Sequence, residues 1–264
     1  MEEQKMEIKE LFDLTNKTAI ITGGGRGLGE QIANAYAEAG ANIVVCSRKL
    51  EACQEVSEKL KAKGVKAIAL QCDVTKQEDI DAVVETTLKE FGSIDILVNN
   101  SGASWGAPAL EMPVEAWDKV MDVNVKAIFM FSQKVGKVMA DQGSGKIINI
   151  ASIAGTGGQN PEVMDAIGYS TSKGAVITFT KDLAVKLARY NIHVNAIAPG
   201  FFPTKMAKGV LDEAGERLLA HTPAGRFGSD YDMKGAALFL ASKASDYVYG
   251  HTLVVDGGAS AAVI

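Results

Sequence analysis

A tyrosine and a lysine four positions apart carry the clearest chemical signal in this sequence. Tyr169 and Lys173 open a segment of helical apolar spacing that runs to about Tyr190. Residues i and i+4 lie on one helix face, so we expect the lysine ammonium next to the phenol. Ionising an unperturbed tyrosine at pH 7 costs about 4 kcal/mol, and a neighbouring cation lowers that cost. The same spacing occurs on ordinary helix surfaces, but beside the signals below it predicts a tyrosine that transfers protons.

A serine that follows a predicted strand extends this site. The strand covers residues 145–150, and Ser152 comes two positions after it. A hydroxyl there is placed to hydrogen-bond a substrate carbonyl and to hold it in position. The three side chains together predict proton transfer to or from a carbonyl oxygen.

A glycine-rich segment separates the first predicted strand, 18–22, from the first long predicted helix, 31–39. It reads Thr-Gly-Gly-Gly-Arg-Gly-Leu-Gly over residues 22–29. Glycines let the backbone turn tightly and approach a pyrophosphate, and the helix N-terminus offers free N–H groups and a positive dipole end. Glycines alone are also compatible with a flexible loop, but this position between strand and helix favours dinucleotide binding.

The end of the second predicted strand, 42–47, indicates which dinucleotide binds. An NAD site usually places an Asp or Glu there for the ribose 2′-hydroxyl, whereas this strand ends in Cys46, Ser47 and Arg48. Arg48, with Arg26 and the Ser47 hydroxyl, is suited to the 2′-phosphate of NADP. At about 1.5–3 kcal/mol for each charged hydrogen-bond partner, two arginines correspond to a preference of about 10²–10⁴-fold for NADP(H) over NAD(H). The alternative is that both arginines are solvated surface residues.

The elements that position these residues alternate short β-branched runs with longer helical segments, which predicts an α/β fold. We expect a single-domain, Rossmann-type, doubly wound sheet of about seven parallel strands with helices on both faces. Several strands are almost continuously apolar, as is typical of central parallel strands. The predicted strands are 18–22, 42–47, 66–71, 94–99, 145–150, 192–197 and 252–255. Helices 31–39 and 50–63 end before Gly40 and Gly64, which predicts glycine caps. Residues 1–16 are expected to be an extension of the 17–264 domain, which includes a substrate lid at about 201–225.

Composition excludes several classes of function. The net charge is −5, and no cluster of Lys and Arg predicts a nucleic-acid partner. The apolar stretches, such as 235–241, are much too short for a membrane span. The segment 1–14 lacks the apolar core of a secretory signal, and three irregularly spaced cysteines suit a reducing cytoplasm. The three histidines lack the spacing of a zinc site, so we predict no metal.

Further motifs resemble the main branch of the short-chain dehydrogenase/reductase family, over about residues 14–258. Asp73-Val74 resembles the family's adenine-contacting pair, and residues 99–102, Asn-Asn-Ser-Gly, resemble its Asn-Asn-Ala-Gly strand end. Asn124 matches an asparagine that holds a helix kink and a relay water in the family. Residues 199–204 resemble the segment that binds the nicotinamide carboxamide and diphosphate, with Phe202 and Thr204 at the contacting positions.

The resemblance implies hydride exchange with a ketone or secondary alcohol, with Tyr169 as general acid or base. It implies a catalytic tetrad of Asn124, Ser152, Tyr169 and Lys173, in which Lys173 lowers the tyrosine pKa and holds the ribose. It also implies a homotetramer with a small-molecule carbonyl or alcohol substrate. The cofactor-binding residues expected from the motifs and the resemblance are Gly23, Gly25, Arg26, Gly27, Leu28, Ser47, Arg48, Asp73, Val74, Asn100, Gly102, Tyr169, Lys173, Pro199, Gly200, Phe202 and Thr204.

The interval between Ser152 and Tyr169 departs from the family pattern, because it is a few residues longer. The extra segment, 160–165, is expected beside the substrate and either shapes specificity or is a solvated loop with a turn at Pro161. A lid helix is expected over 205–220. The expected substrate-pocket residues are Ser104, Trp105, Ser152, Met164, Tyr169, Phe201 and Met206.

The substrate class stays open between two interpretations of this pocket. Apolar lid residues such as Val210 and Leu219 favour an alkyl or acyl substrate, whereas Lys205, Lys208 and Glu162 suit a sugar acid. A carbonyl or 3-oxoacyl reductase is the first hypothesis, and a dehydrogenase resembling gluconate 5-dehydrogenases is the alternative. A catalytically idle NADP sensor is a third hypothesis, against which the four filled tetrad positions argue.

Overall fold

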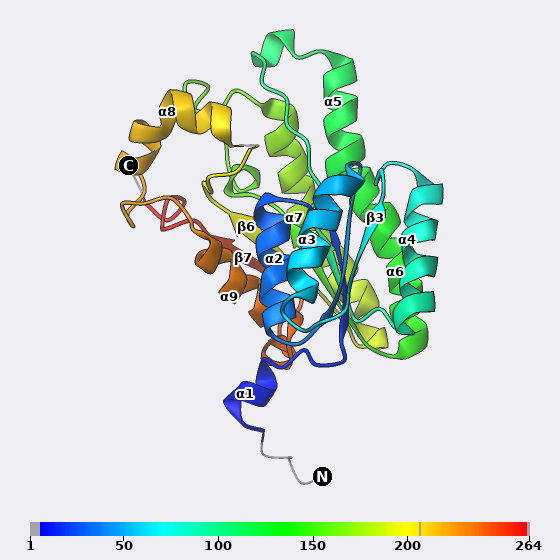
Figure 1. The fold of residues 1–264 in the computed structure, drawn as a ribbon. Helices are drawn as coiled ribbons and strands as arrows, with labels where there is room; N and C mark the ends of the chain where they lie inside the picture. The colour runs from blue at the N-terminus through cyan, green and yellow to red at the C-terminus, as the bar shows by residue number, and fades with distance from the viewer. Residues whose placement is uncertain (1–5, 206, 263–264) are drawn as a thin grey trace.

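A single sheet of seven parallel strands forms the centre of the computed structural model, which describes residues 6–205 and 207–262 (Figure 1). The strand order is β3-β2-β1-β4-β5-β6-β7, so the winding reverses between β1 and β4. This confirms the predicted Rossmann-type, doubly wound fold, and it places the ligand-binding edge at the carboxyl ends of the strands. The strands are β1 (Thr18–Thr22), β2 (Asn42–Ser47), β3 (Ala67–Gln71), β4 (Ile96–Asn99), β5 (Gly145–Ile150), β6 (Ile192–Pro199) and β7 (Thr252–Val255).

Helices cover both faces of the sheet, and each face has its own apolar core. One core packs α2, α3 and α9 against side chains such as Ile21 and Val45, and the other packs α4, α6 and α7 against Ile20 and Val44. Neighbouring residues of β1 and β2 therefore point to opposite cores, as the period of a strand requires. The helices are α1 (Ile8–Leu11), α2 (Gly27–Glu38), α3 (Leu50–Lys61), α4 (Gln77–Phe91), α5 (Val114–Met121), α6 (Ala127–Gln142), α7 (Ile167–Leu187), α8 (Lys208–Ala220) and α9 (Asp230–Ala241).

Element boundaries differ from the sequence-based expectations by a few residues. Helix α2 begins at Gly27 rather than at residue 31, so the glycine-rich segment supplies its first turn. The predicted cap at Gly40 is present with φ of 94°, and a Cβ there would lie 2.7 Å from the Thr15 hydroxyl. Helix α8 begins at Lys208 rather than at residue 205. The differences arise because apolar periodicity marks the middle of an element better than its ends.

A π-helical turn, Asp122–Lys126, joins α5 to α6. Such turns bend a helix and leave its backbone hydrogen bonds out of register. Asn124 lies in this turn and is fully buried. The bend therefore brings one polar side chain inward at the carboxyl edge of the sheet.

None of the helices within residues 6–205 and 207–262 has the length and apolarity needed to span a bilayer.

Candidate active site

Tyr169 and Lys173 face the same region from the first turns of α7, next to the end of β5. The Lys173 ammonium lies 5.6 Å from the centroid of the Tyr169 ring. It donates a 2.7 Å hydrogen bond to the carbonyl oxygen of Ile150, the last residue of β5. Ser152 follows Ile150 closely, and its Oγ accepts a bond from the backbone N–H of Ala154 at 3.1 Å. The fold thus brings together the three side chains that the sequence singled out.

Burial is the main cause of the pKa shifts of Tyr169 and Lys173. Burial raises the pKa of Tyr169, and a hydrogen bond with Ser152 lowers it in part. Burial also lowers the pKa of Lys173 from its ordinary value of 10.5 to about 8. Within the protein Ser152, rather than Lys173, is thus the group that opposes the rise in the tyrosine pKa. A lysine that titrates near pH 8 is still mainly a cation at pH 7.

The amide of Asn124 ties three segments together around the tyrosine. Its Oδ1 accepts from the Ala103 N–H at 2.7 Å, and its Nδ2 donates to the Ala103 carbonyl and to the Ser172 hydroxyl, each at 2.9 Å. Ser172 in turn donates to the backbone carbonyl of Tyr169 at 2.7 Å. Both amide hydrogens are therefore used, and Asn124 fixes the loop after β4 to the first turn of α7. Ser172 was not among the expected site residues, although it lies within the Tyr-Ser-Thr-Ser-Lys segment.

A close approach of backbone to backbone also sets the position of α7. A short 3-10 turn, Ile153–Gly155, follows Ser152 and packs directly on the helix. A Cβ on Gly155 would lie 2.4 Å from the carbonyl carbon of Lys173. Only glycine permits this contact, which packs the turn after Ser152 directly on the backbone of Lys173. The single glycine gave no usable signal in the sequence.

The glycine-rich loop is shaped by Thr22, at the end of β1, and Asn100, the residue after β4. The Thr22 hydroxyl accepts from the N–H groups of Asn100 and Ser101, both at 3.0 Å. Asn100 Nδ2 donates to the carbonyls of Thr22 and Gly23 at 2.9 and 3.2 Å. Gly23 has φ of 64°, and a Cβ on Gly29 would lie 2.5 Å from both Asn100 Nδ2 and the Gly23 carbonyl oxygen. The loop is therefore preformed at the start of α2, as a diphosphate cradle requires.

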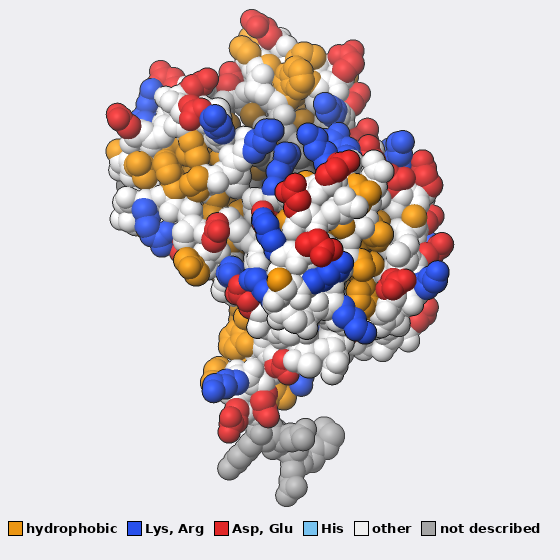
Figure 2. Space-filling view, in the orientation of Figure 1, with side chains coloured by type: hydrophobic (Ala, Val, Ile, Leu, Met, Phe, Trp, Pro, Cys, Tyr) orange, Lys and Arg blue, Asp and Glu red, His pale blue; other side chains and the backbone are white. Residues whose placement is uncertain are grey.

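The two predicted phosphate-binding arginines are exposed at the same edge. Arg26 precedes α2 and Arg48 follows β2, and neither guanidinium forms an ion pair with another of the described residues. Figure 2 shows Lys and Arg side chains gathered near the N-terminal ends of α2 and α3. Between these two segments, the Ser47 hydroxyl donates to the Lys49 carbonyl at 3.0 Å and lies 3.2 Å from the Cys53 sulfur. The edge thus offers positive charge to an anion.

Asp73 and Val74 follow β3, next to Arg48 on this positive edge. Burial raises the pKa of Asp73, but hydrogen bonds from Thr75 and the charges of Arg48 and Lys76 outweigh it, so the net pKa is lowered. The Asp73 N–H donates to Asp79 at 2.7 Å, which fixes the turn, and Val74 is buried. Asp73 therefore offers an ionised carboxylate beside Arg48, whereas the Val74 side chain packs in the core with Ile20 and Val44.

The 199–204 segment meets the glycine-rich loop at the far end of the site. A Cβ on Gly27 would lie 3.4 Å from Thr204 Cγ2, so these two predicted cofactor contacts are neighbours. Gly200 packs on Asp256, where a Cβ would lie 2.7 Å from the aspartate Cβ. The Phe202 side chain, however, is buried in the core beneath Gly228. Phe202 therefore presents only its backbone to a ligand.

Apart from Tyr169 on α7, the described pocket residues lie on the segments that follow β4, β5 and β6 or precede α7. Ser104 and Trp105 are exposed, and Met164 and Phe201 are half-buried. The Ala107 N–H donates to the Asp165 carbonyl at 2.9 Å, which joins the loop after β4 to the segment before α7. Met206 lies outside the described residues. Figure 2 shows the surface hollowed between α8 and α5, above the basic side chains.

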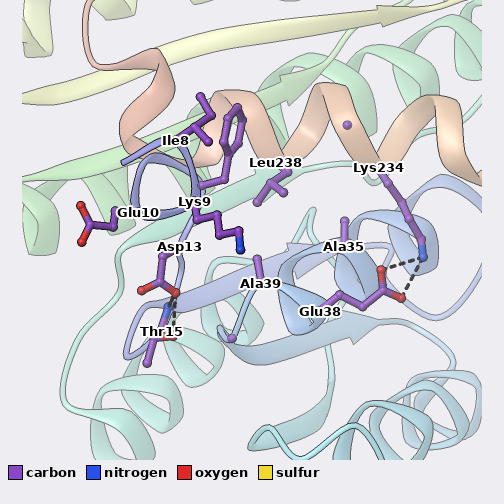
Figure 3. A pocket seen from close by; sticks show the side chains of 13 residues that line it. Ile8, Lys9, Glu10, Asp13, Thr15, Ala35, Glu38, Ala39, Lys234 and Leu238 are labelled. Carbon is purple, nitrogen blue, oxygen red and sulfur yellow. Dashed lines mark hydrogen bonds and ion pairs between the residues drawn. The ribbon is translucent and has the colours of Figure 1, made fainter. Parts of the chain in front are cut away.

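A second concavity lies far from this chemistry. It is an open groove of about 920 Å³ between α1, the C-terminal end of α2 and α9. Figure 3 shows Lys234 reaching Glu38 across one side of it, at 2.9 and 3.0 Å, and Ile8 and Leu238 at the other. The groove is at the opposite end of α2 from the glycine-rich loop and contains no member of the tetrad, so its size does not make it the active site.

Comparison with known proteins decides the family. The family model described as "Enoyl-(Acyl carrier protein) reductase" matches residues 23–260, which include the whole tetrad. The chain belongs to the short-chain dehydrogenase/reductase family. This short-chain dehydrogenase/reductase is accordingly an oxidoreductase that acts between CH–OH and C=O groups. Its fold is the one expected from the sequence resemblance.

Individual relatives align with this short-chain dehydrogenase/reductase along almost its whole length. It is 42% identical over 258 residues to 5-keto-D-gluconate 5-reductase of Escherichia coli, covering 97% of this chain and 100% of the relative. It is 39% identical over 244 residues to a 3-oxoacyl-[acyl-carrier-protein] reductase of Staphylococcus epidermidis, covering 92% and 98%. The structure of a gluconate 5-dehydrogenase from Burkholderia cenocepacia, in complex with NADP and tartrate, superimposes with a TM-score of 0.92 at 38% identity, covering 97% and 100%.

Proposed function

We propose that this enzyme reduces a ketone to a secondary alcohol with NADPH and that Tyr169 donates the proton to the carbonyl oxygen. The observation that carries the proposal is the meeting of Tyr169, Lys173 and Ser152 at the carboxyl edge of the sheet, beside a preformed glycine-rich loop. The residues present fit a dinucleotide, because no side chain caps the backbone N–H groups at the start of α2, which stay available to an anion. When bound, the nicotinamide supplies or accepts the hydride.

Each residue of the tetrad has a distinct task in this proposal. Ser152 hydrogen-bonds the substrate oxygen and holds it near the Tyr169 hydroxyl, which passes its proton to that oxygen. Lys173 keeps a positive charge beside the phenolate that remains. Asn124 acts as a positioning residue, since its amide is fully bonded to Ala103 and Ser172. Oxidation of the alcohol follows the same steps in reverse.

Replacing Lys173 by methionine is expected to stabilise the protein at pH 7, measured without cofactor, while it abolishes turnover. The pKa of Lys173 falls from 10.5 to about 8 on burial, so at about 1.4 kcal/mol per pKa unit the buried cation costs about 3 kcal/mol. Losing the bond to the Ile150 carbonyl offsets part of this gain, which leaves a net stabilisation of about 1–2 kcal/mol.

The pH dependence checks the cause of that stabilisation. Below pH 8 Lys173 is charged in both the folded and the unfolded state, so burying its charge destabilises the folded state by the full amount. This destabilisation decreases as the pH rises from 8 to 10.5, because the folded protein then holds the neutral amine. Urea unfolding at pH 7 and pH 10 should therefore show a larger difference between the variant and the native enzyme at pH 7. A variant that is less stable than the native enzyme at both pH 7 and pH 10 would contradict the conclusion that the buried Lys173 charge destabilises the fold.

The preference for NADP(H) over NAD(H) is part of the same proposal. Arg26 and Arg48 are exposed and without ion-pair partners among the described residues, and β2 ends without a carboxylate. A 2′-phosphate placed between them would receive charged hydrogen bonds that a 2′-hydroxyl could not use. The B. cenocepacia structure in complex with NADP supports this choice.

We favour a compact keto acid of the 5-keto-D-gluconate type as the substrate. The full-length similarity to the E. coli 5-keto-D-gluconate 5-reductase supports it, as do the exposed cations Lys205 and Lys208 on the expected lid segment. A 3-oxoacyl thioester is the second candidate, because Val210 and Leu219 are half-buried on α8 and the S. epidermidis reductase is similar. NADPH consumption with 5-keto-D-gluconate, an acetoacetyl thioester and aryl ketones decides between them.

The proposal extends to a cytoplasmic homotetramer. The three cysteines are buried and unpaired, which suits a reducing compartment. The side chains of Val185 on α7 and Phe129 on α6 are exposed to solvent, so each of these helices presents a large apolar side chain on its surface. A symmetry mate packed there would cover both side chains.

Val185→Glu is expected to dissociate the tetramer, because burying an unpaired carboxylate in an apolar interface is costly. Light scattering of the native enzyme and of this variant measures the change in mass, with Val185→Ala as the apolar control. A native enzyme that is monomeric would overturn the proposed assembly.

A further inference from the structure

An ion pair joins the two segments that frame the proposed substrate pocket. Arg217 on α8 donates from Nη1 to Glu162 Oε2 at 3.0 Å, across 55 residues of sequence. Glu162 lies in the segment 160–165, which makes the interval before Tyr169 unusually long, and Arg217 lies on the lid helix. Nothing in the sequence alone connects these two segments.

The turn that carries Glu162 is built to present it. Asn160 Oδ1 accepts from the Glu162 N–H, and the Asn160 carbonyl accepts from the N–H groups of Val163 and Met164, at 2.9 to 3.0 Å. The chain continues through Asp165, whose carbonyl is bonded to Ala107, and then enters α7 just before Tyr169. The position of Glu162 is therefore coupled through a short, bonded segment to the proposed proton donor.

Backbone hydrogen bonds flank helix α8 at both ends, and few of its side chains are buried. Before it, the Ala207 N–H donates to the Thr204 carbonyl at 3.1 Å, and beyond it the Ala224 N–H donates to the Gly257 carbonyl at 3.0 Å. Along the helix only Ala214 and Leu218 are buried. Among the described side chains of α8, Arg217 alone forms a hydrogen bond with the segment 160–165. An element with so little buried apolar surface opens at low free-energy cost.

We propose that Glu162 and Arg217 form a latch that holds α8 against the 160–164 turn and thereby restricts the size of the ketone admitted to Tyr169. Both side chains are exposed, at 74% and 52%. An exposed pair of this kind is weak and sensitive to salt, so it closes the lid without preventing product release. The kinetic part of this inference rests on the proposed function, whereas the lid contact itself does not.

Charge reversal tests the latch in two independent assays. The variants are Glu162→Arg, Arg217→Glu and the double reversal, which restores the pair with opposite polarity. Lys-C cleavage after Lys208, followed by mass spectrometry, measures lid opening without any substrate. Each single variant is expected to be cleaved about two- to five-fold faster, and the double variant at the native rate.

The kinetic assay compares a compact with a bulky ketone, 5-keto-D-gluconate and an aryl alkyl ketone, each with NADPH. The ratio of kcat/KM for the bulky ketone to that for the compact ketone is expected to rise about two- to five-fold in each single variant. In the double variant this ratio is expected to return to the native value. Lys61→Glu is the matched control, because it reverses one charge of the exposed Lys61–Glu58 pair on α3, whose exposures are 48% and 70%.

The outcomes separate failure of the latch from failure of the proposed function. Single variants cleaved at the native rate, a double variant that does not recover, or an equal effect of Lys61→Glu would each overturn the latch. If neither ketone is reduced by the native enzyme, the proposed function fails while the Lys-C result still decides whether the pair holds the lid.

Discussion

Tyr169→Phe is expected to lower kcat for ketone reduction by at least about 10²–10⁴-fold, the range that general acid–base catalysis supplies. The change removes the one oxygen of Tyr169 that can give up a proton and leaves the ring, which is half-buried beside Lys173, in place. Packing and cofactor binding should therefore survive. Stopped-flow measurement of NADPH oxidation at saturating substrate isolates the loss in the chemical step.

Two controls make this result specific to proton donation. NADPH binding to Tyr169→Phe, followed by fluorescence, should stay within a few-fold of the native value, because the hydroxyl does not build the glycine-rich loop. Ser152→Ala should also lose activity, since Ser152 hydrogen-bonds Tyr169 and is proposed to hold the substrate oxygen. Near-normal turnover by Tyr169→Phe would exclude Tyr169 as the proton donor.

Arg48→Asp is expected to lower the preference for NADPH over NADH by about 10²-fold or more. Loss of one charged hydrogen-bond partner accounts for about 1.5–3 kcal/mol, or about 10–150-fold. The new carboxylate repels the 2′-phosphate and offers an acceptor to a 2′-hydroxyl. The ratio of kcat/KM for the two cofactors, measured at constant ionic strength, reports the change.

A charge-matched control separates local from general electrostatics. Arg189→Asp makes the same change in net charge near the C-terminal end of α7, where Arg189 stacks on the Tyr190 ring at 4.8 Å. It should leave the cofactor ratio almost unchanged, because surface charges beyond a Debye length are screened. An Arg48→Asp enzyme with the native cofactor ratio would show that Arg48 is a solvated surface residue.

The stability and lid variants probe different properties of the same site. Lys173→Met asks whether the site holds a strained cation, and the Glu162–Arg217 reversals ask how the pocket closes. A gain in stability on removing Lys173 would be consistent with a site selected for chemistry at the expense of folding free energy.

Local patterns in the sequence determined the fold and the position of the proposed chemistry. Strands β1, β2, β5 and β7 have the predicted ends, because buried parallel strands are short apolar runs bounded by polar residues or glycine. Tyr169 and Lys173 share a helix face because they are separated by about one helical turn. The glycine-rich loop lies where it was expected because a strand, a tight turn and a helix follow one another along the chain. Each of these signals is contained within a few residues.

Contacts between distant segments were decided only by the tertiary structure. Asn124 reaches Ser172 across 48 residues, Thr22 reaches Asn100 across 78, and Glu162 reaches Arg217 across 55. Such bonds connect common polar side chains or backbone groups, so they leave no periodic pattern in the sequence. Burial likewise sets the pKa of Tyr169 and of Lys173, and burial depends on what the rest of the chain places around them. The sequence thus singled out the residues proposed to carry the chemistry, and the packing of distant segments decided how they are held and how strongly they bind a proton.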